Sequence, residues 1–310
     1  MKVHYFLILC FLGLSLTACD DDDDGNSFKL GDEPTTVKGL TFVENEDTPL
    51  DRIYNDVRDD LRAAGPISIV AEVNHTINAG NVGEALRPTR VILFGNPALG
   101  TPLMMENMAA GLDLPQKIVF YQVEDEDVIV AYNSPRYLAS RHGLNEDSEQ
   151  LDMIGDALET FVENNTGESI KRSRDQEVDR NEGIVTVTSD DSVEEVFNRL
   201  RGAIESNSNL SVVATLDHSA NAATVGMTLP DSRLIVFGNP RLGTPLMQTT
   251  QTIAIDLPQK MLVYDNGTNT SIIYNDPVYL ARRHDMNTSL MEFGMIATAL
   301  ANLADTAAGD

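Results

Sequence analysis

The chain of 310 residues contains an internal repeat, and this repeat limits its possible folds more than any other feature. Residues 94–104 read FGNPALGTPLM and recur at 237–247 as FGNPRLGTPLM, with ten of eleven positions identical. The segment DLPQK at 113–117 recurs at 256–260 with the same spacing of 143 residues. Repetition over such a distance predicts two copies of one folding unit in tandem.

A third repeated segment shows where the two copies differ in length. YNSPRYLASRH at 132–142 recurs as YNDPVYLARRH at 274–284, where the spacing has fallen to 142 residues. The missing residue falls in a polar stretch that includes residues 124–127 of the first copy. Because hairpin turns tolerate changes in length, we expect a β-hairpin turn there.

Apolar periodicity predicts the same order of elements in both copies. Alternating apolar residues at 37–43 predict a first strand, and apolar residues three and four apart at 50–61 predict a helix. Each copy is therefore predicted to be an α+β domain of the form β-α-β4-α, with about five mostly antiparallel strands and a helix between the third and fourth strands. The other expected strands are 67–73, 91–94, 117–122, 128–132, 184–188, 210–216, 234–237, 260–264 and 271–274, and the other expected helices are 151–161, 193–204 and 293–303.

Proline-containing pairs predict further helix starts. Thr101-Pro102 and Thr244-Pro245 are expected to open a helix, with threonine as the N-cap and proline at the first helical position. Ser134-Pro135 and Asp276-Pro277 predict a second, short helix in the same way. The preceding Gly-Asn-Pro loop is either a strand-to-helix turn or a place where free backbone amides bind an anion or a carbonyl oxygen.

The repeat and the composition together predict the domain boundaries. The charged stretch between the copies has no apolar period, so it is expected to be a solvated linker. The predicted parts are a signal peptide at 1–18, an acidic tether at 19–34, a first domain at 35–165, a charged linker at 166–182 and a second domain at 183–310.

The N-terminal residues predict export and a lipid anchor. A single lysine precedes a short apolar run that ends in Leu16-Thr17-Ala18-Cys19, which is typical of a signal peptide and resembles a lipobox. Cleavage before Cys19 would place lipid on that cysteine and make the membrane a partner; an ordinary signal peptide with an incidental cysteine is the alternative. We expect the protein to lie in the cell envelope, anchored at the outer membrane. The acidic run Asp20–Asp24 is either a spacer or, by its resemblance to Bacteroidetes-type surface lipoproteins, an export signal to the outer face.

Charge and missing motifs exclude several classes of function. The formal net charge of −26 opposes binding to nucleic acid, because the phosphate backbone would be repelled. Cys10 lies in the predicted signal peptide, so Cys19 would be the only mature cysteine and no disulfide is expected. The sequence has no GxSxG, P-loop, HExxH or GxGxxG motif, and no two histidines have i,i+4 spacing. We therefore predict no cofactor and no metal site.

The repeated segments FGNPxLGTPLM, LPQK and YNxPxYLAxRH resemble the domain of unknown function 302 family across nearly the whole mature chain, as two copies. The resemblance implies a TBP-like α+β fold, in which helices back a curved antiparallel sheet. It also implies that single-copy relatives associate as homodimers, which a tandem chain would reproduce as an intrachain pseudo-dimer. It implies no activity.

The four histidines of the predicted mature chain form two matched pairs. His75 corresponds to His218, each at the end of a second strand, and both are followed by a matched asparagine. These rings are expected either to line a pocket, as acid/base groups or hydrogen-bonding groups, or to hold a loop in place. His142 and His284 follow an arginine near the end of a short helix, where a cation complements the helix dipole.

The candidate ligand-binding residues are the matched polar residues around these histidines. A lysine in each set would neutralise an acidic ligand, unless it simply lies exposed at a strand start. The set comprises His75, Asn78, Asn96, Thr101 and Lys117 in the first copy, and His218, Asn221, Asn239, Thr244 and Lys260 in the second.

Three functions remain open from the sequence. We expect a non-enzymatic envelope module that binds a small molecule or a protein at two equivalent sites, because duplication with both sites kept fits pseudo-two-fold binding. The second is an enzyme with a hydrolase-like or isomerase-like reaction, in which His75 and His218 act as acid/base groups and no catalytic residue is otherwise assigned. The third is a purely structural pair of repeats.

Overall fold

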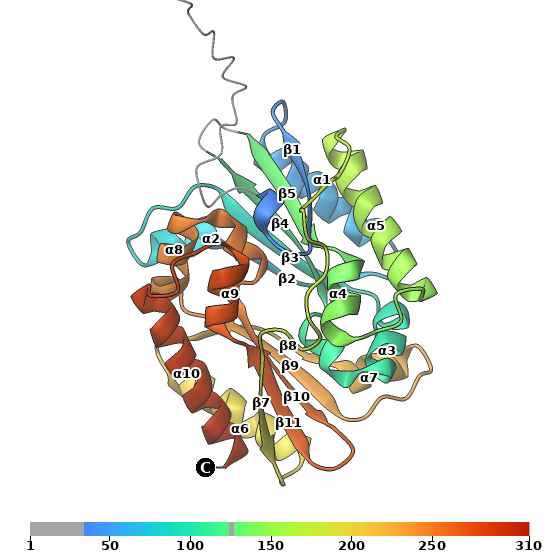
Figure 1. The fold of residues 1–310 in the computed structure, drawn as a ribbon, viewed down its shortest axis with the longest axis vertical. Helices are drawn as coiled ribbons and strands as arrows, with labels where there is room; N and C mark the ends of the chain where they lie inside the picture. Colours follow the sequence, from blue (N-terminus) through green and yellow to red (C-terminus); the bar gives the residue numbers. More distant parts are fainter. Residues whose placement is uncertain (1–33, 124–126, 310) are drawn as a thin grey trace, which may run out of the picture.

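A computed structural model describes residues 34–123 and 127–309 of the chain. The predicted signal peptide, Cys19, the acidic run and the tip of the first hairpin turn lie outside these residues. The described part forms two α+β halves, and Figure 1 shows the first half above the second. Both halves follow the same element order, so the predicted fold class of two tandem α+β domains is confirmed.

The sheet of the first half is antiparallel, with strand order β2-β3-β4-β5-β1-β6. Its first five strands occupy the predicted segments to within a few residues. The strands are β1 (Leu40–Asn45), β2 (Ser68–Asn74), β3 (Thr89–Gly95), β4 (Gln116–Gln122), β5 (Val128–Asn133) and β6 (Lys171–Arg172).

The sheet of the second half repeats this arrangement in the order β7-β11-β10-β9-β8. Even its irregularities recur, since β2 is bulged between Ile69 and Ala71 and β8 between Val212 and Ala214. The halves are therefore two copies of one backbone. The strands are β7 (Ile184–Ser189), β8 (Ser211–Asp217), β9 (Ser232–Gly238), β10 (Gln259–Asp265) and β11 (Thr270–Asn275).

Two long helices cover one face of each sheet, α1 with α5 and α6 with α10 (Figure 1). Their apolar residues follow the predicted helical spacing and are buried against the strands. The long helices are α1 (Leu50–Ala63), α5 (Glu149–Thr166), α6 (Val193–Ser206) and α10 (Met291–Ala308).

Short helices follow the strands at matched positions. Helix α2 packs against α8 of the other half, and α3 packs against α7, so the short helices tie the halves together on two sides. They are α2 (His75–Asn81), α3 (Pro97–Glu106), α4 (Pro135–His142), α7 (His218–Thr224), α8 (Pro240–Thr249) and α9 (Pro277–Arg283), with 3-10 turns η1 (Pro34–Thr36), η2 (Met108–Leu112) and η3 (Gln251–Ile255).

The first sheet is buried on both faces, because the second half covers the face that its own helices leave free. In β3, Ile92 and Phe94 join the core under α1 and α5, whereas Val91 and Leu93 join a core shared with the second half. Turn η2 packs on strands of the second sheet and η3 on strands of the first. Burial of both faces explains why β3 and β9 are continuous apolar runs and do not alternate.

The structure corrects the predicted start of the helix after the third strand. Helix α3 begins at Pro97, and the N-cap is Asn96, whose side chain accepts a hydrogen bond from the Ala98 amide. Thr101 is buried within the helix, and Pro102 lies in its interior. Helix α8 begins in the same way, so the threonine cap predicted for both copies is wrong. The short helices that open at Ser134 and Asp276 are confirmed.

The segment between the halves packs against the first half. Strand β6 pairs with β1 at Thr41 and Phe42, and the Gly39 amide donates to the Asp175 carbonyl oxygen at 2.7 Å. The predicted solvated linker therefore contributes an edge strand to the first sheet.

Candidate functional site

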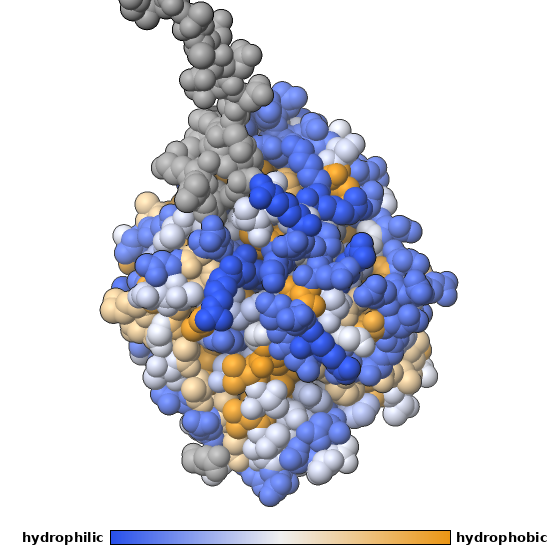
Figure 2. All heavy atoms as spheres, viewed as in Figure 1, coloured by the Kyte–Doolittle hydropathy of each residue, from blue (hydrophilic) through white to orange (hydrophobic). Residues whose placement is uncertain are grey.

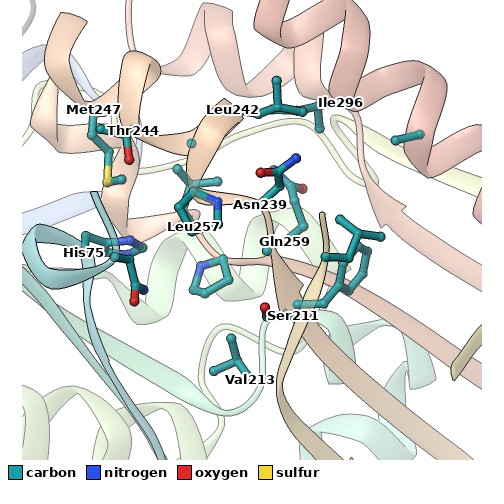
Figure 3. Close-up of a pocket in the computed structure, with 18 of the residues that line it drawn as sticks. His75, Ser211, Val213, Asn239, Leu242, Thr244, Met247, Leu257, Gln259 and Ile296 are labelled. Atoms are coloured by element: carbon teal, nitrogen blue, oxygen red, sulfur yellow. The ribbon is translucent and has the colours of Figure 1, made fainter. Parts of the chain in front are cut away.

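Two pockets lie where the halves meet, and each is lined by residues of both. The first has a volume of about 210 Å³ and is lined mainly by the second half, with His75 and Asn78 entering from the first half. We call it the His75 pocket (Figure 3). The other has a volume of about 560 Å³ and is lined mainly by the first half, with His218 and Asn221 entering from the second. We call it the His218 pocket.

The walls of the two pockets correspond almost residue for residue. Each is built from the end of the third strand, the following Gly-Asn-Pro helix, the Leu-Pro-Gln segment before the fourth strand and the inner side of the long C-terminal helix of that half. The bulged residues Val70 and Val213 line the two pockets, which is the usual place of a bulge beside a site. The walls are mostly apolar, and no Asp, Glu, Lys or Arg side chain lines either pocket.

Short helices place the two pocket histidines. His75 is the first residue of α2, whose N-cap Asn74 accepts a hydrogen bond from the Ile77 amide. His218 opens α7 in the same way, with Asp217 accepting from Ala220. Because the N-cap fixes the direction in which each helix leaves its strand, the ring at the first helical position is directed across the interface.

The structure groups the predicted site residues across the two halves. His75 and Asn78 meet Asn239 and Thr244 of the second half. The His218 pocket mirrors this grouping, since His218 and Asn221 meet Asn96 and Thr101. In Figure 3 His75 lies at one side of the hollow, with Asn239 and Gln259 across from it. Each copy therefore completes the pocket of the other.

The predicted lysines lie outside both pockets. Lys117 is buried, and its Nζ donates to the Leu257 carbonyl oxygen at 3.1 Å across the interface. Lys260 is also buried, and its Nζ lies 3.0 Å from Oδ1 of Asp113. Neither lysine lines a pocket, and both belong to the interface between the halves.

A buried charge cluster lies at the centre of that interface. The Asp113 carboxylate accepts hydrogen bonds from Arg141 Nη1 at 2.7 Å, from His142 Nε2 at 2.8 Å and from Lys260. Its counterpart Asp256 accepts from the matched arginine and histidine of the second half, at 2.7 and 2.8 Å. These charge-assisted bonds hold the carboxylates ionised, because the neighbouring arginines lower the pKa of each despite the opposing effect of burial.

The arginines of the cluster bind both halves. Arg141 Nη2 donates to the Asn275 side chain at 2.8 Å, and Arg283 Nη2 donates to the Asn133 side chain at 2.7 Å. The hydroxyls of Tyr137 and Tyr279 meet at 3.2 Å, as expected for matched residues at a pseudo-two-fold axis. We call the two arginines, their aspartates, histidines and lysines, and this tyrosine pair the axial cluster.

His142 and His284 lie at helix ends, as predicted, yet their rings bind the buried aspartates. Burial lowers the pKa of both rings, so each is neutral and donates from Nε2 to its carboxylate. The Nδ1 of His284 then accepts from the Thr252 hydroxyl at 2.9 Å. In the first half Ala109 replaces that threonine, and the Nδ1 of His142 has no partner.

The two pocket histidines are neutral as well. Burial lowers the pKa of His75 to about 3, with a further lowering by the charge of Lys117. Burial lowers the pKa of His218 to about 4, although a bond from its Nε2 to the Gly111 carbonyl oxygen at 3.2 Å opposes this effect. A general acid or base works best with a pKa near the operating pH, so these rings are better suited to hydrogen bonding than to proton transfer.

Sequence reasoning missed several residues of the site. Gln116 and Gln259 line the pockets, and Asp113 and Asp256 organise the axial cluster. All four belong to the repeated segment DLPQK, so the repeat itself was the signal. The apolar walls from α5 and α10 were recognised only as core positions.

The described residues lack two features that would indicate a metal-binding or membrane-spanning protein. No group of three or more His, Cys, Asp or Glu residues within 34–123 and 127–309 is placed to hold a metal ion. Among these same residues, no helix has both the length and the apolar character needed to cross a membrane.

Comparison with known proteins identifies the two halves. The sequence profile described as "Domain of unknown function DUF302" matches residues 43–161 and again residues 185–306. The chain belongs to the DUF302 family. The two matches place one DUF302 domain in each half, so the predicted tandem duplication is confirmed.

Relatives of the chain include proteins that carry more than this domain. The chain is 38% identical over 130 residues to "Fluoride-specific ion channel FluC 1" of Brucella suis biovar 1, which covers 41% of the chain and 51% of that protein. It is equally similar to "Fluoride-specific ion channel FluC 2" of Brucella melitensis biotype 1, with 48% of that protein covered. The chain thus spans about half the length of these curated relatives.

A solved DUF302 structure is also similar. It is described as an uncharacterized conserved protein from Bacillus stearothermophilus, and it is 17% identical with a TM-score of 0.37. The likeness covers 40% of the chain and 98% of that structure.

Proposed function

We propose that this DUF302 protein is a lipid-anchored protein of the cell envelope that binds small, uncharged, mostly apolar molecules in its two pockets. The observation that carries the proposal is the pair of matched pockets between the halves, each apolar-walled and without a charged side chain. Concave sites of this kind, with a few convergent polar groups, are typical of small-molecule binding.

The composition of the pockets favours an uncharged ligand. An ionised ligand would lose its hydration without gaining a charged partner. Burial of a neutral polar group without a hydrogen bond already costs on the order of 2–7 kcal/mol, and burial of an unpaired charge costs far more. Exposed apolar side chains at the pockets, Met153 at one and Val213 at the other, fit the approach of an apolar molecule. The face seen in Figure 2 is mainly hydrophilic and carries several hydrophobic patches.

The histidines favour binding over acid/base catalysis. Their pKa values of about 3 and about 4 keep both rings neutral across the physiological range. A neutral imidazole offers one donor and one acceptor in a fixed place, which suits recognition of a ligand hydroxyl or carbonyl.

The test uses pocket-filling variants at matched positions. Ala299 lines the His75 pocket and Ala157 the His218 pocket, so Ala299→Trp and Ala157→Trp should each fill one pocket. The probe is 1-naphthylamine, a neutral bicyclic dye that is small enough for either pocket and whose emission shifts to shorter wavelength in apolar surroundings. Thr298→Trp, at an exposed position of the same helix, is the control.

We expect two dye molecules to bind per wild-type chain, one per single pocket-filling variant and none to the double variant. Thr298→Trp should bind as the wild type does. Absence of dye binding to the wild type, or equal binding by the wild type and the double variant, would refute ligand binding in these pockets.

The envelope location rests on the N-terminal sequence. The lipobox-like ending at Cys19 and the acidic run after it support a lipid anchor on an exported protein. Detergent-phase partitioning of the protein made in a bacterial host should be lost in Cys19→Ser. Equal partitioning of the two forms would contradict the anchor.

A further inference from the structure

The two pockets share their walls but differ in their unpaired polar atoms. In the His75 pocket, His75 Nε2 and the Thr244 hydroxyl oxygen are buried and have no hydrogen-bond partner. His75 is 6% exposed and Thr244 is fully buried. Figure 3 shows both at the same side of the hollow.

The His218 pocket has no such pair among the described residues. His218 Nε2 is bonded to the Gly111 carbonyl oxygen, and neither it nor the Thr101 hydroxyl is among the buried atoms without a partner. The residue that corresponds to Gly111 in the second half is Ala254. A Cβ atom at Gly111 would lie 2.6 Å from Cε of Met104, so a larger residue there would displace the end of that side chain.

A buried polar atom without a partner costs about 1–3 kcal/mol, so two of them facing one cavity point to a partner that the protein itself does not supply. We infer that the His75 pocket selects an uncharged, mostly apolar molecule that carries a hydroxyl group, whereas the His218 pocket accepts apolar molecules without that selection. This inference rests on the proposed function and adds the class of ligand.

A hydroxyl group matches the two unpaired atoms best. The Thr244 hydroxyl can donate or accept, and neutral His75 can do either at Nε2, depending on its tautomer. A ligand hydroxyl both donates and accepts, so it can satisfy the two atoms together in either tautomer. A carboxylate only accepts and carries a charge, and Lys117 is outside the pocket and bonded to the Leu257 carbonyl oxygen.

The size of the cavity limits the ligand further. A protein cavity of roughly 150 Å³ holds a benzene molecule, so the His75 pocket, at about 210 Å³, suits a compact ligand such as a bicyclic aromatic alcohol. The His218 pocket, at about 560 Å³, has room for a larger apolar molecule.

The experiment compares 2-naphthol with 2-methylnaphthalene, which has the same shape but a methyl group in place of the hydroxyl. Calorimetric titration is performed on Ala157→Trp, which leaves the His75 pocket open, and on Ala299→Trp, which leaves the His218 pocket open. Apolar transfer favours the methyl compound, so a preference for 2-naphthol requires a polar interaction.

We expect 2-naphthol to bind the His75 pocket about tenfold more tightly than 2-methylnaphthalene, as one net hydrogen bond provides. Thr244→Val keeps the side-chain shape and should remove this preference. In the His218 pocket the preference should be absent, and Thr101→Val, the matched control, should leave the ratio of affinities unchanged.

The outcomes separate the two proposals. Equal or weaker binding of 2-naphthol in the His75 pocket would overturn the selection while leaving pocket binding intact. A preference that survives Thr244→Val, or one that is the same in both pockets, would also overturn it. If neither compound binds wild-type protein, the proposed function fails and the inference fails with it.

Discussion

We predict that Asp113 of the axial cluster is essential for stability, because it is the buried anion that accepts hydrogen bonds from three donors. Asp113→Asn keeps the shape of the side chain and removes its charge. The folded protein would then hold Arg141 and Lys260 at 2.7 and 3.0 Å from a neutral amide in the interface between the halves. The amide also cannot accept at both positions, so at least one donor loses its bond.

The expected loss is large, because removing one partner of a buried ion pair leaves an uncompensated charge. Such substitutions cost about 3–5 kcal/mol, and we expect Asp113→Asn to lower the free energy of unfolding by that amount. Asp256→Asn is the matched comparison. Asp256 accepts from an arginine and a histidine but has no lysine within hydrogen-bonding distance, so its substitution should cost about 1.5 kcal/mol less.

The assay is urea unfolding followed by circular dichroism and by tyrosine fluorescence, since the chain has eight tyrosines and no tryptophan. Both probes should report the same midpoint if the halves unfold together. A loss of less than about 1 kcal/mol in Asp113→Asn, or a larger loss in Asp256→Asn, would refute the assigned role of the cluster.

Three further predictions concern pH, a histidine partner and a glycine. Burial lowers the pKa of the two pocket histidines to about 3 and about 4, so the folded protein keeps them neutral while the unfolded chain takes up protons below about pH 6.5. The free energy of unfolding should therefore fall by about 2 kcal/mol per histidine between pH 7 and pH 5, a range that lies above the titration of the carboxylates. A urea midpoint that does not change between these pH values would contradict this. Thr252→Ala removes the donor to the Nδ1 of His284 and should lower the free energy of unfolding in urea by about 1–3 kcal/mol. An unchanged free energy of unfolding would contradict this role of Thr252. Gly183 has a φ of +67°, and a Cβ there would lie 2.0 Å from the ring of Tyr279, so Gly183→Ala should cost about 3 kcal/mol. Gly226 has a φ of +74° but open space around it, so Gly226→Ala should cost only about 1 kcal/mol. Equal shifts of the melting temperature in the two variants would count against the packing argument.

The sequence predicted the elements within each copy because their signals are local. Alternating and helical apolar periods are read within about ten residues, and the repeat doubled each observation. The helix start after the third strand was misplaced because Asn96-Pro97 and Thr101-Pro102 both fit the pattern of a cap followed by proline. Local pattern alone does not choose between them. Strand β6, at two residues, is too short to show any period.

The site was only partly predictable, because its essential feature is a contact between distant segments. Sequence reasoning found His75 and the Gly-Asn-Pro helices as candidates. It had no means of seeing that His75 lies against Thr244 of the other copy rather than Thr101 of its own. The same holds for the bond between Arg141 and Asn275, which joins residues 134 positions apart. Such pairings depend on how the two sheets pack.

The sharing of each pocket between the two halves is tested most directly by nuclear Overhauser effects from a bound probe. The measurement uses 1-naphthylamine bound to Ala157→Trp, in which only the His75 pocket is open. We predict contacts from the dye to the ring protons of His75 and to the methyl group of Met247 in the same complex. Contacts that join Met247 with His218, or that reach Met247 without any histidine, would contradict the account.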